Sequence, residues 1–304
     1  MKQQRAFSYA KYGYLFSIPF IVVFCIFNLY PTIYTAILGF TDCKGLGNTE
    51  WKFLVEEPFK NFQQILENPS FKTAVLNTFK IWIMNFIPQI SLALLLTAWF
   101  TSRRNVLKGQ SFFKVVFYMP NIITAASVAI LFNALFGYPM GPVNDLIVSW
   151  GLTDKPFAFI DNKIAAQCIV AFIQFWQWYG YTMIILISGV LGINPEIYEA
   201  AELDGANDIQ MFFRVTIPNL KTILLYTLIT SLIGGLTMYD IPRLFNDGKP
   251  ANATLTATMF IHNQAFKGSY MYNRASAASL LIFVVVAICS AFVFLLMRDK
   301  NERR

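Results

Sequence analysis

The sequence is poor in charged residues and in the side chains that most often carry chemistry. Only 13% of its 304 residues are charged, about half the share that is usual in a soluble domain. It has one histidine, His262, so a histidine-based metal or proton-relay site within a membrane is not expected. There is no GxxxxGK(S/T) phosphate-binding loop, so the chain should not itself bind ATP through one. These absences predict that the chain is not an enzyme and that it has no catalytic residues, metal site or cofactor.

Cysteines and internal repeats are also scarce. The four cysteines form no CxxC pair; Cys25, Cys168 and Cys289 lie in apolar runs, and Cys43 directly follows one. This placement favours small core residues over metal ligands or disulfides. No internal repeat stands out, which argues against the secondary transporters that are built from inverted repeats.

The sequence is rich in long apolar runs. Hydrophobic residues make up 56% of the chain, and several runs approach or exceed the roughly 20 residues that a helix needs to cross a bilayer. We therefore expect an all-α polytopic membrane protein with six transmembrane helices. The expected spans are residues 12–38, 71–100, 115–136, 164–190, 221–245 and 275–297. The first is too long for a signal peptide and lacks a convincing cleavage site, so we interpret it as an uncleaved anchor.

Basic residues near the span ends predict the orientation. They form three clusters: Lys2, Arg5 and Lys11; Arg103, Arg104, Lys108 and Lys114; and Arg298, Lys300, Arg303 and Arg304. With six spans all three clusters fall on one side, and short basic loops stay in the cytoplasm. Both chain termini are therefore expected inside. The net charge of +7 is explained by this topology and by attraction to anionic membrane lipid, without a nucleic-acid partner.

A polar, acidic stretch at residues 195–218 separates two apolar segments and has the features of a short helical hairpin. Asn194 can cap a helix that begins at Pro195, and Gly205 can take the left-handed conformation that ends it. Asn207 or Asp208 can cap a second helix that runs through Phe212, and Phe212 and Phe213 would press against the bundle. This pattern fits a docking surface for a partner, and equally a solvated loop that packs only on its own bundle.

The hairpin also carries a motif. Glu199-Ala200-Ala201 is followed after three residues by Gly205 and, after nine more, by Val215-Thr216-Ile217-Pro218. This pattern resembles the EAA loop of the permease subunits of binding-protein-dependent ABC importers, with Val215 and Ile217 in place of the usual Ile and Leu. The run YEAAELDGAN, followed by two phenylalanines and an arginine, is similar to the carbohydrate branch and to its maltose-type first permease subunit. The resemblance extends from about residue 71 to the C-terminus.

The resemblance implies a type I importer fold in a bacterial cytoplasmic membrane, with the first hairpin helix as a cytoplasmic coupling helix. The implied partners are a second homologous permease subunit, two copies of a cytoplasmic ABC ATPase that hydrolyses the ATP, and an extracytoplasmic solute-binding protein. Glu199 would contact a basic residue of the ATPase, and Gly205 would set the bend. The residues expected at this contact are Glu199, Ala200, Ala201, Asp204, Gly205, Phe212 and Pro218.

Two helical faces are candidates for the solute path. They consist of Gln174, Gln177, Trp178 and Tyr181 on the fourth span, and of Ser231, Gly235 and Met238 on the fifth. Amides, hydroxyls and aromatic rings suit a neutral polyhydroxyl solute, whereas an ion path usually needs buried charge. Alternatively, the glutamines join helices and the aromatic residues lie at the membrane interface.

Charged residues within the expected spans are few. Lys80 lies early in the second span, where its stem can reach the outer interface. Asp240 and Arg243 are spaced to pair with each other at the end of the fifth.

The expected function is that of a permease subunit that translocates a sugar or oligosaccharide delivered by the solute-binding protein. The alternatives are a glycerol-phosphate-type permease, which would need a basic residue on its path, and an ATP-independent facilitator. Three regions are expected: residues 1–70, with the first span and an outer loop; 71–297, the transporter domain; and 298–304, a basic cytoplasmic tail. The outer loops 41–70, 137–163 and 247–274 form our hypothetical platform for the binding protein.

Overall fold

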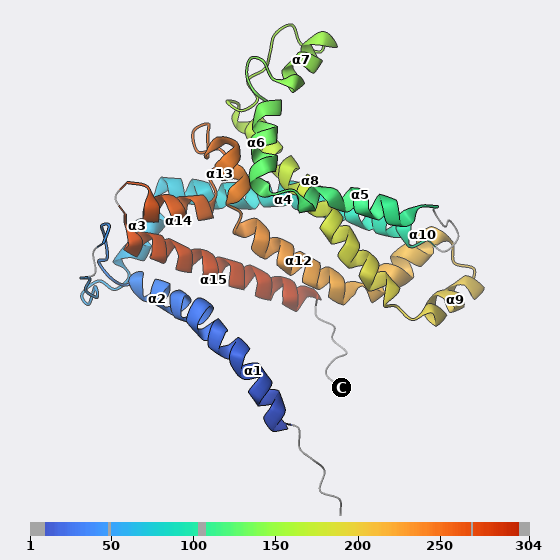
Figure 1. Ribbon diagram of the computed structural model, residues 1–304, viewed down its shortest axis with the longest axis horizontal. Helices are drawn as coiled ribbons and strands as arrows, with labels where there is room; N and C mark the ends of the chain where they lie inside the picture. Colours follow the sequence, from blue (N-terminus) through green and yellow to red (C-terminus); the bar gives the residue numbers. More distant parts are fainter. Residues whose placement is uncertain (1–9, 48–49, 103–107, 269, 298–304) are drawn as a thin grey trace, which may run out of the picture. The chain divides into compact units, whose positions relative to one another are not determined.

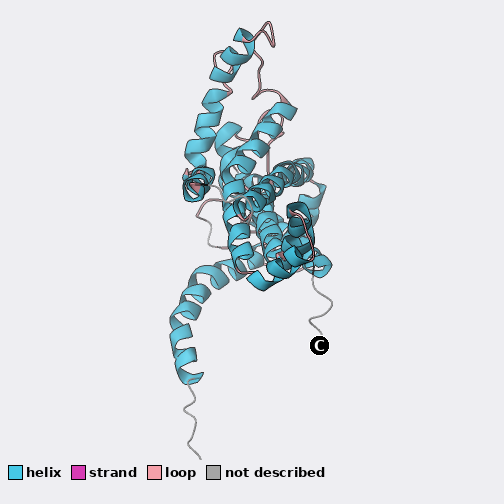
Figure 2. Cartoon of the chain, turned by 90° about the vertical axis from the view of Figure 1, so that its right-hand side faces the viewer, coloured by secondary structure: helices cyan, strands magenta, loops and turns pink. Residues whose placement is uncertain are grey.

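The computed structural model describes residues 10–47, 50–102, 108–268 and 270–297. No strand occurs among these residues, and their one sheet-like contact is an isolated antiparallel bridge between Thr41 and Phe53. Figure 2 accordingly shows helices joined by loops. The expected all-α architecture is confirmed. Much of the basic clusters, namely Lys2, Arg5, Arg103, Arg104 and residues 298–304, lies outside the described residues.

The helices have the following bounds: α1 (Ala10–Phe24), α2 (Tyr30–Leu38), α3 (Lys60–Glu67), α4 (Pro69–Phe100), α5 (Gln110–Ile122), α6 (Ala125–Leu135), α7 (Pro142–Ser149), α8 (Lys163–Leu191), α9 (Pro195–Leu203), α10 (Asp208–Gln210), α11 (Ile217–Asn219), α12 (Lys221–Leu236), α13 (Asp240–Asn246), α14 (Ala257–Phe266) and α15 (Tyr272–Met297). Two π-helical turns, Cys25–Leu29 and Met211–Thr216, join α1 to α2 and α10 to α11.

Five of the six expected spans are long and apolar enough to cross a membrane. Within the described part of the chain they are Tyr12–Leu38, Pro69–Phe100, Lys163–Leu191, Lys221–Asn246 and Tyr272–Met297. Their bounds agree with the sequence-based spans to within a few residues. In the fifth span the helix is broken between Leu236 and Asp240, where α12 ends and α13 begins.

The third expected span, 115–136, is not one straight helix. α5 and α6 meet there at an angle of 87°, and they make a sixth span if the bent pair is counted as one crossing. The reason is a helix cap in the middle: the Thr124 hydroxyl oxygen accepts a hydrogen bond from the Ser127 amide at 3.2 Å, which starts a new helix. Ile123, just before it, is extended. The expectation of a continuous helix over this segment was wrong.

The chain forms two compact units: Asn68–Phe260 with Ile282–Arg304, and Met1–Glu67 with Ile261–Leu281. In the first, α8 packs along α4 and also against α5 and α12, while α6 packs against α13 (Figure 1). The division into residues 1–70, 71–297 and 298–304 stays a prediction.

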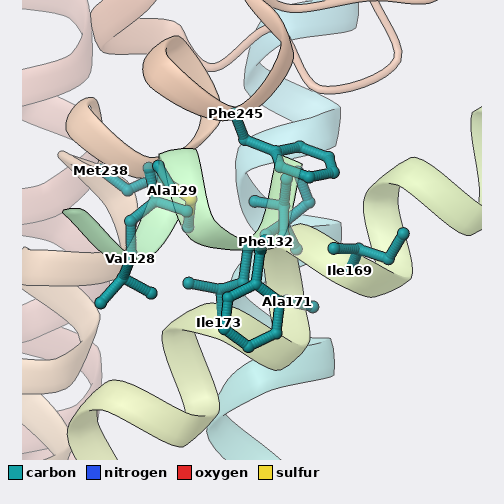
Figure 3. Close-up of a cluster of buried hydrophobic side chains, with 11 residues drawn as sticks. Val128, Ala129, Phe132, Ile169, Ala171, Ile173, Met238 and Phe245 are labelled. Atoms are coloured by element: carbon teal, nitrogen blue, oxygen red, sulfur yellow. The ribbon is translucent and has the colours of Figure 1, made fainter. Parts of the chain in front are cut away.

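A buried apolar cluster holds the first of these units together. Val128, Ala129 and Phe132 of α6 meet Ile169, Ala171 and Ile173 of α8, with Phe245 of α13 above them (Figure 3). Ile81 of α4 belongs to the same cluster. Because the cluster joins α6 and α13, the helices that follow the two helix breaks, to α4 and α8, apolar packing fixes the second half of each broken span in place.

In the other unit, buried amides fasten the loop after the first span. Asn61 donates to the carbonyl oxygens of Gly39 and Thr41 at 2.9 and 2.8 Å, and Asn273 donates to Asn61 at 3.0 Å. This network ties residues 39–61 to the start of α15. Side-chain amides satisfy backbone groups that a loop would otherwise leave unpaired.

The four cysteines are free thiols, as expected. Only Cys43 is a buried core residue, since Cys25 and Cys168 are exposed and Cys289 is half-buried. Burial raises the pKa of the Cys43 thiol, and the adjacent Asp42 carboxylate raises it further. The thiol therefore stays protonated at neutral pH and is a poor metal ligand or nucleophile.

α5 and α8 approach each other closely at Gly180. A Cβ atom at Gly180 would lie 2.1 Å from the carbonyl oxygen of Phe117 and 2.9 Å from the Tyr118 Cα. Both are backbone atoms, which cannot move aside as a flexible side chain can. Glycine at 180 is thus required by the packing of these two helices.

We predict that Gly180→Ala lowers the thermal stability of the purified protein in detergent, because α5 and α8 must separate. The expected loss is on the order of 1–3 kcal/mol. Gly13→Ala is the matched control, since Gly13 is also helical and a Cβ there meets no atom within 4 Å. Equal melting temperatures for the two variants would contradict this account of the packing.

Candidate functional site

The first half of the hairpin, residues 195–218, has the predicted shape. The Asn194 side chain accepts a hydrogen bond from the Glu196 amide at 3.1 Å and so caps α9, which begins at Pro195. α9 ends at Leu203, and Gly205 has a φ of +80°, the left-handed conformation that glycine adopts without strain. These sequence-based predictions are confirmed.

The second half begins with a capping box. The Gln210 amide donates to the Asn207 side chain at 2.8 Å, and the Asn207 amide donates to the Gln210 side chain at 3.0 Å. The predicted cap at Asn207 is therefore confirmed. The helix that follows continues through a π-helical turn to Asn219, so the expected end at Phe212 was too early.

The hairpin is fixed to the spans on either side of it. The Tyr198 and Thr216 hydroxyls lie 3.2 Å apart in a buried hydrogen bond between its two halves. Tyr198 also packs in a cluster with Val190, near the end of α8, and with Leu220, directly before α12. A displacement of the hairpin would therefore act on both α8 and α12.

The outer face of the hairpin carries both acidic and apolar groups. Glu199, Ala200, Asp204, Gly205 and Pro218 are exposed, while Ala201 and Phe212 are half-buried. The exposed face also includes three large apolar side chains: Leu203 at 90%, Ile209 at 71% and Phe213 at 62% of their full exposure. Phe213 packs edge-on against Phe212, at 5.4 Å between ring centroids, and the expectation that it presses against the bundle is wrong.

A cavity of about 690 Å³ adjoins the hairpin. Its lining comes from the last turns of α4, including Leu94 and Trp99, and from hairpin residues that include Glu202, Ile209 and Phe212. The cavity continues the apolar part of the exposed face. Sequence reasoning missed this lining from α4, because the spacing of one helix does not say which distant helix end lies beside it.

A second cavity, of about 680 Å³, lies between the spans; we call it the inter-span cavity. Its walls come from α4, the α5–α6 junction, α8, α12 and the start of α13. It brings together all the residues that the sequence suggested for the solute path: Gln174, Gln177, Trp178, Tyr181, Ser231, Gly235 and Met238. It also contains polar residues that we had not assigned to the path: Asn85, Gln89, Asn121, Tyr226, Thr227, Thr230 and Asp240.

Some of these residues make hydrogen bonds that hold the cavity wall together. Gln177 donates to the carbonyl oxygen of Ile123 at 2.8 Å, at the break between α5 and α6. The carbonyl of Met238, at the break in the fifth span, accepts from the Thr256 hydroxyl at 2.9 Å. Side chains thus satisfy backbone groups that both breaks release. Gln177 therefore joins helices, as the alternative interpretation of the glutamines predicted. Gln174 makes no hydrogen bond with the described residues and is only half-buried.

Two of the suggested path residues belong mainly to the packing. The Met238 side chain is 5% exposed and lies in the buried apolar cluster. A Cβ at Gly235 would lie 2.0 Å from Trp82 Cδ1, so Gly235 makes room for that indole. Trp178 and Tyr181, by contrast, form an edge-to-face pair at 5.7 Å that lines the cavity, an arrangement suited to ring stacking with a solute.

The inter-span cavity is almost free of charge. Among its described lining residues, Asp240 is the one Asp, Glu, Lys, Arg or His. Arg243, expected to pair with Asp240, instead bonds to Asp247. Lys80 donates to the side-chain oxygen of Gln167 at 2.6 Å and does not line the cavity. No group of three His, Cys, Asp or Glu residues in the described ranges could hold a metal ion.

Membrane-spanning helices around a polar, nearly uncharged cavity, together with a surface hairpin fixed to two of them, define a subunit of a membrane transporter. Residues 65–304 match the profile of a family described as binding-protein-dependent transport system inner membrane component. The chain belongs to this family. It is a multi-pass permease subunit of an ABC importer, in agreement with the sequence-based expectation.

Curated relatives cover nearly the whole chain. The lactose transport system permease protein LacF of Rhizobium radiobacter is 29% identical, over 95% of both chains. The arabinooligosaccharides transport system permease protein AraP of Bacillus subtilis is 28% identical over 90% of this chain and 85% of its own. The multiple sugar-binding transport system permease protein MsmF of Streptococcus mutans is 26% identical over 92% of each.

The fold also matches solved structures. A chain of a bacterial ABC transporter involved in the import of the acidic polysaccharide alginate superimposes with a TM-score of 0.79, at 22% identity and over 95% of both chains. The same kind of transporter, in complex with an alginate pentasaccharide-bound periplasmic protein, gives a TM-score of 0.77. The type I importer permease fold is thereby confirmed.

We predict that Gln177→Met destabilises the protein, whereas Gln174→Met does not. The first change leaves the Ile123 carbonyl without its donor, at a cost of about 1–3 kcal/mol. The second, one turn away on the same helix, removes no hydrogen bond among the described residues. Thermal unfolding of the purified proteins in detergent measures both, and a loss of equal size in the two variants would refute the assignment.

Proposed function

We propose that this permease subunit translocates a sugar or oligosaccharide that an external solute-binding protein delivers to it. The observation that carries the proposal is the wall of the inter-span cavity, where amides, hydroxyls and the Trp178–Tyr181 ring pair surround a nearly uncharged space. Amides and hydroxyls hydrogen-bond sugar hydroxyls, and aromatic rings stack on sugar faces. Relatives named for lactose, arabinooligosaccharide and multiple-sugar transport support the same class of solute.

The proposed complex contains a second homologous permease subunit, two copies of a cytoplasmic ATPase that hydrolyses the ATP, and the solute-binding protein. The family description names a binding-protein-dependent system, and one structural neighbour is a complex with its periplasmic protein. The inter-span cavity is lined here by one chain, and we propose that the second subunit completes it.

The hairpin is the proposed contact with the ATPase. Its exposed acidic and apolar face supports this role for Glu199, Ala200, Ala201, Asp204, Gly205, Phe212 and Pro218. Leu203 and Ile209 extend the contact with large apolar surface, which is enriched in the centre of interfaces. Both chain termini and the hairpin would then lie on the cytoplasmic side, as the basic clusters predict.

The coupling follows from the attachment of the hairpin. The cluster of Tyr198, Val190 and Leu220 joins it to α8 and α12, and both of these helices line the inter-span cavity. Closure of the ATPase dimer around ATP would pull the hairpin and so tilt two walls of the cavity. ATP and the loaded binding protein drive this change only by binding one state more tightly than the other.

The charge of the cavity argues against a glycerol-phosphate permease. None of the described lining residues is Lys, Arg or His, and a phosphate group in a low-dielectric path needs a cation or several donors. The exposed docking face of the hairpin argues against a facilitator that works without ATP, because a free-standing pore has no use for it.

We predict that Glu199→Lys lowers two activities of the reconstituted importer, each by a factor of about ten or more. They are binding-protein-dependent sugar uptake and the ATP hydrolysis that the binding protein stimulates. The added cation would repel the basic partner that we propose on the ATPase. Glu199→Gln, which removes the negative charge but adds no cation, should have a smaller effect. Full activity of Glu199→Lys would remove Glu199 from the coupling contact, and uptake by this chain without an ATPase would overturn the importer proposal.

The tip between α6 and α7 is a proposed contact with the solute-binding protein. Its Met140 side chain is 88% exposed, and Asn144 holds the tip together by bonding to Gly137 and Phe157. We predict that Met140→Asp raises the half-saturating concentration of loaded binding protein about tenfold. ATP hydrolysis without binding protein should stay unchanged. An unaltered half-saturating concentration would exclude this tip from the docking platform.

A further inference from the structure

The one carboxylate in the inter-span cavity lies in an unusual place. Asp240 is the first residue of α13, directly after the break in the fifth span, and it is exposed to the cavity that it lines. It belongs to the candidate membrane span Lys221–Asn246. An ionisable residue at such a position indicates a functional site by default, because placing a charge there is costly.

The surroundings leave the charge of Asp240 uncompensated. No hydrogen bond or ion pair joins its carboxylate to another described residue, and Arg243, one turn further along α13, is engaged by Asp247. The other described lining residues are amides, hydroxyls, aromatic rings and aliphatic groups. Asp240 is therefore the one acidic or basic side chain that the described wall presents to this half of the path.

We propose that Asp240 is a specificity-determining residue that admits uncharged saccharides and rejects acidic ones. This inference rests on the proposed sugar-transport function and names the class of sugar within it. A carboxylate is a strong acceptor for sugar hydroxyl groups, so it favours a neutral polyhydroxyl solute. The same carboxylate repels a uronate or a sugar phosphate, and the repulsion is strong where water is scarce.

The comparison with the alginate importer supports a role for single side chains in selecting the charge of the solute. That transporter imports an acidic polysaccharide, and it shares the fold of this chain at 22% identity. The fold is therefore compatible with anionic cargo, and the charge of the solute must be determined by individual side chains. In this chain the described cavity wall contains no cationic side chain that could bind an anionic solute, and it contains one carboxylate that would repel it.

The test measures direct binding of sugars to the complete importer in lipid nanodiscs, without its solute-binding protein, so that the binding protein cannot preselect the ligand. The neutral probes are lactose, maltotriose, arabinotriose and diacetylchitobiose, and the acidic probe is a mannuronate trisaccharide. Tryptophan fluorescence reports binding, because Trp178 lines the cavity. Wild type is compared with Asp240→Asn, which keeps the shape and removes the charge, and with Asp240→Glu, which keeps the charge.

We expect wild type to bind its best neutral probe at least about tenfold more tightly than the acidic one. In Asp240→Asn this ratio should fall severalfold through a gain in affinity for the mannuronate, which misfolding could not produce. Raising the salt from about 20 to 500 mM should reduce the ratio in wild type more than in Asp240→Asn. Asp240→Glu should keep the preference for the neutral probe.

The outcomes separate the two proposals. If wild type binds mannuronate as tightly as the neutral sugars, or if Asp240→Asn leaves the ratio unchanged, the assignment of Asp240 fails while sugar transport stands. If no probe binds and the complex with its binding protein takes up no sugar, the proposed function itself fails.

Discussion

Backbone groups inside a membrane must find their hydrogen-bond partners within the protein, and the inter-span cavity depends on how this chain meets that demand. Two of its spans are broken, at Ile123 and at Met238, and each break releases carbonyl groups. Gln177 satisfies the first and Thr256 the second. The breaks would be costly in lipid, but here they face the inter-span cavity. The irregular backbone therefore occurs where it borders the cavity, and side chains beside it supply the hydrogen bonds that it needs.

The second organising feature is that the same two helices border both the inter-span cavity and the hairpin. α8 and α12 line the inter-span cavity, and they flank the hairpin that projects from between them. The buried cluster of Tyr198, Val190 and Leu220 leaves little freedom between hairpin and spans. A rigid connection of this kind would transmit a displacement of the hairpin without a separate relay of residues, because the hairpin is attached to the same helices that line the inter-span cavity.

Local patterns in the sequence predicted much of this structure. Asn194, Pro195 and Gly205 define the hairpin helix through caps and backbone preferences that act within a few residues, so its bounds were readable. Features that depend on partners distant in the sequence could not be predicted from these local patterns. The lining of the inter-span cavity by Asp240 and Asn121 requires knowing which helices lie opposite each other. The 87° bend at Thr124 was missed because its apolar flanks read as one continuous span. Phe213 looked like a core residue by composition, yet it is exposed.

The exposed apolar face of the hairpin also has a consequence for the life of the subunit before it is assembled. Leu203 and Ile209 present large hydrocarbon surfaces on a hairpin whose shape is set by its own caps, so the surface is formed whether or not a partner is present. Such surfaces attract chaperones, proteases and one another. An orphan subunit would therefore be short-lived in the cell, and its abundance would follow the supply of the protein that covers this face. The stoichiometry of the importer would then be maintained by selective degradation of unassembled chains.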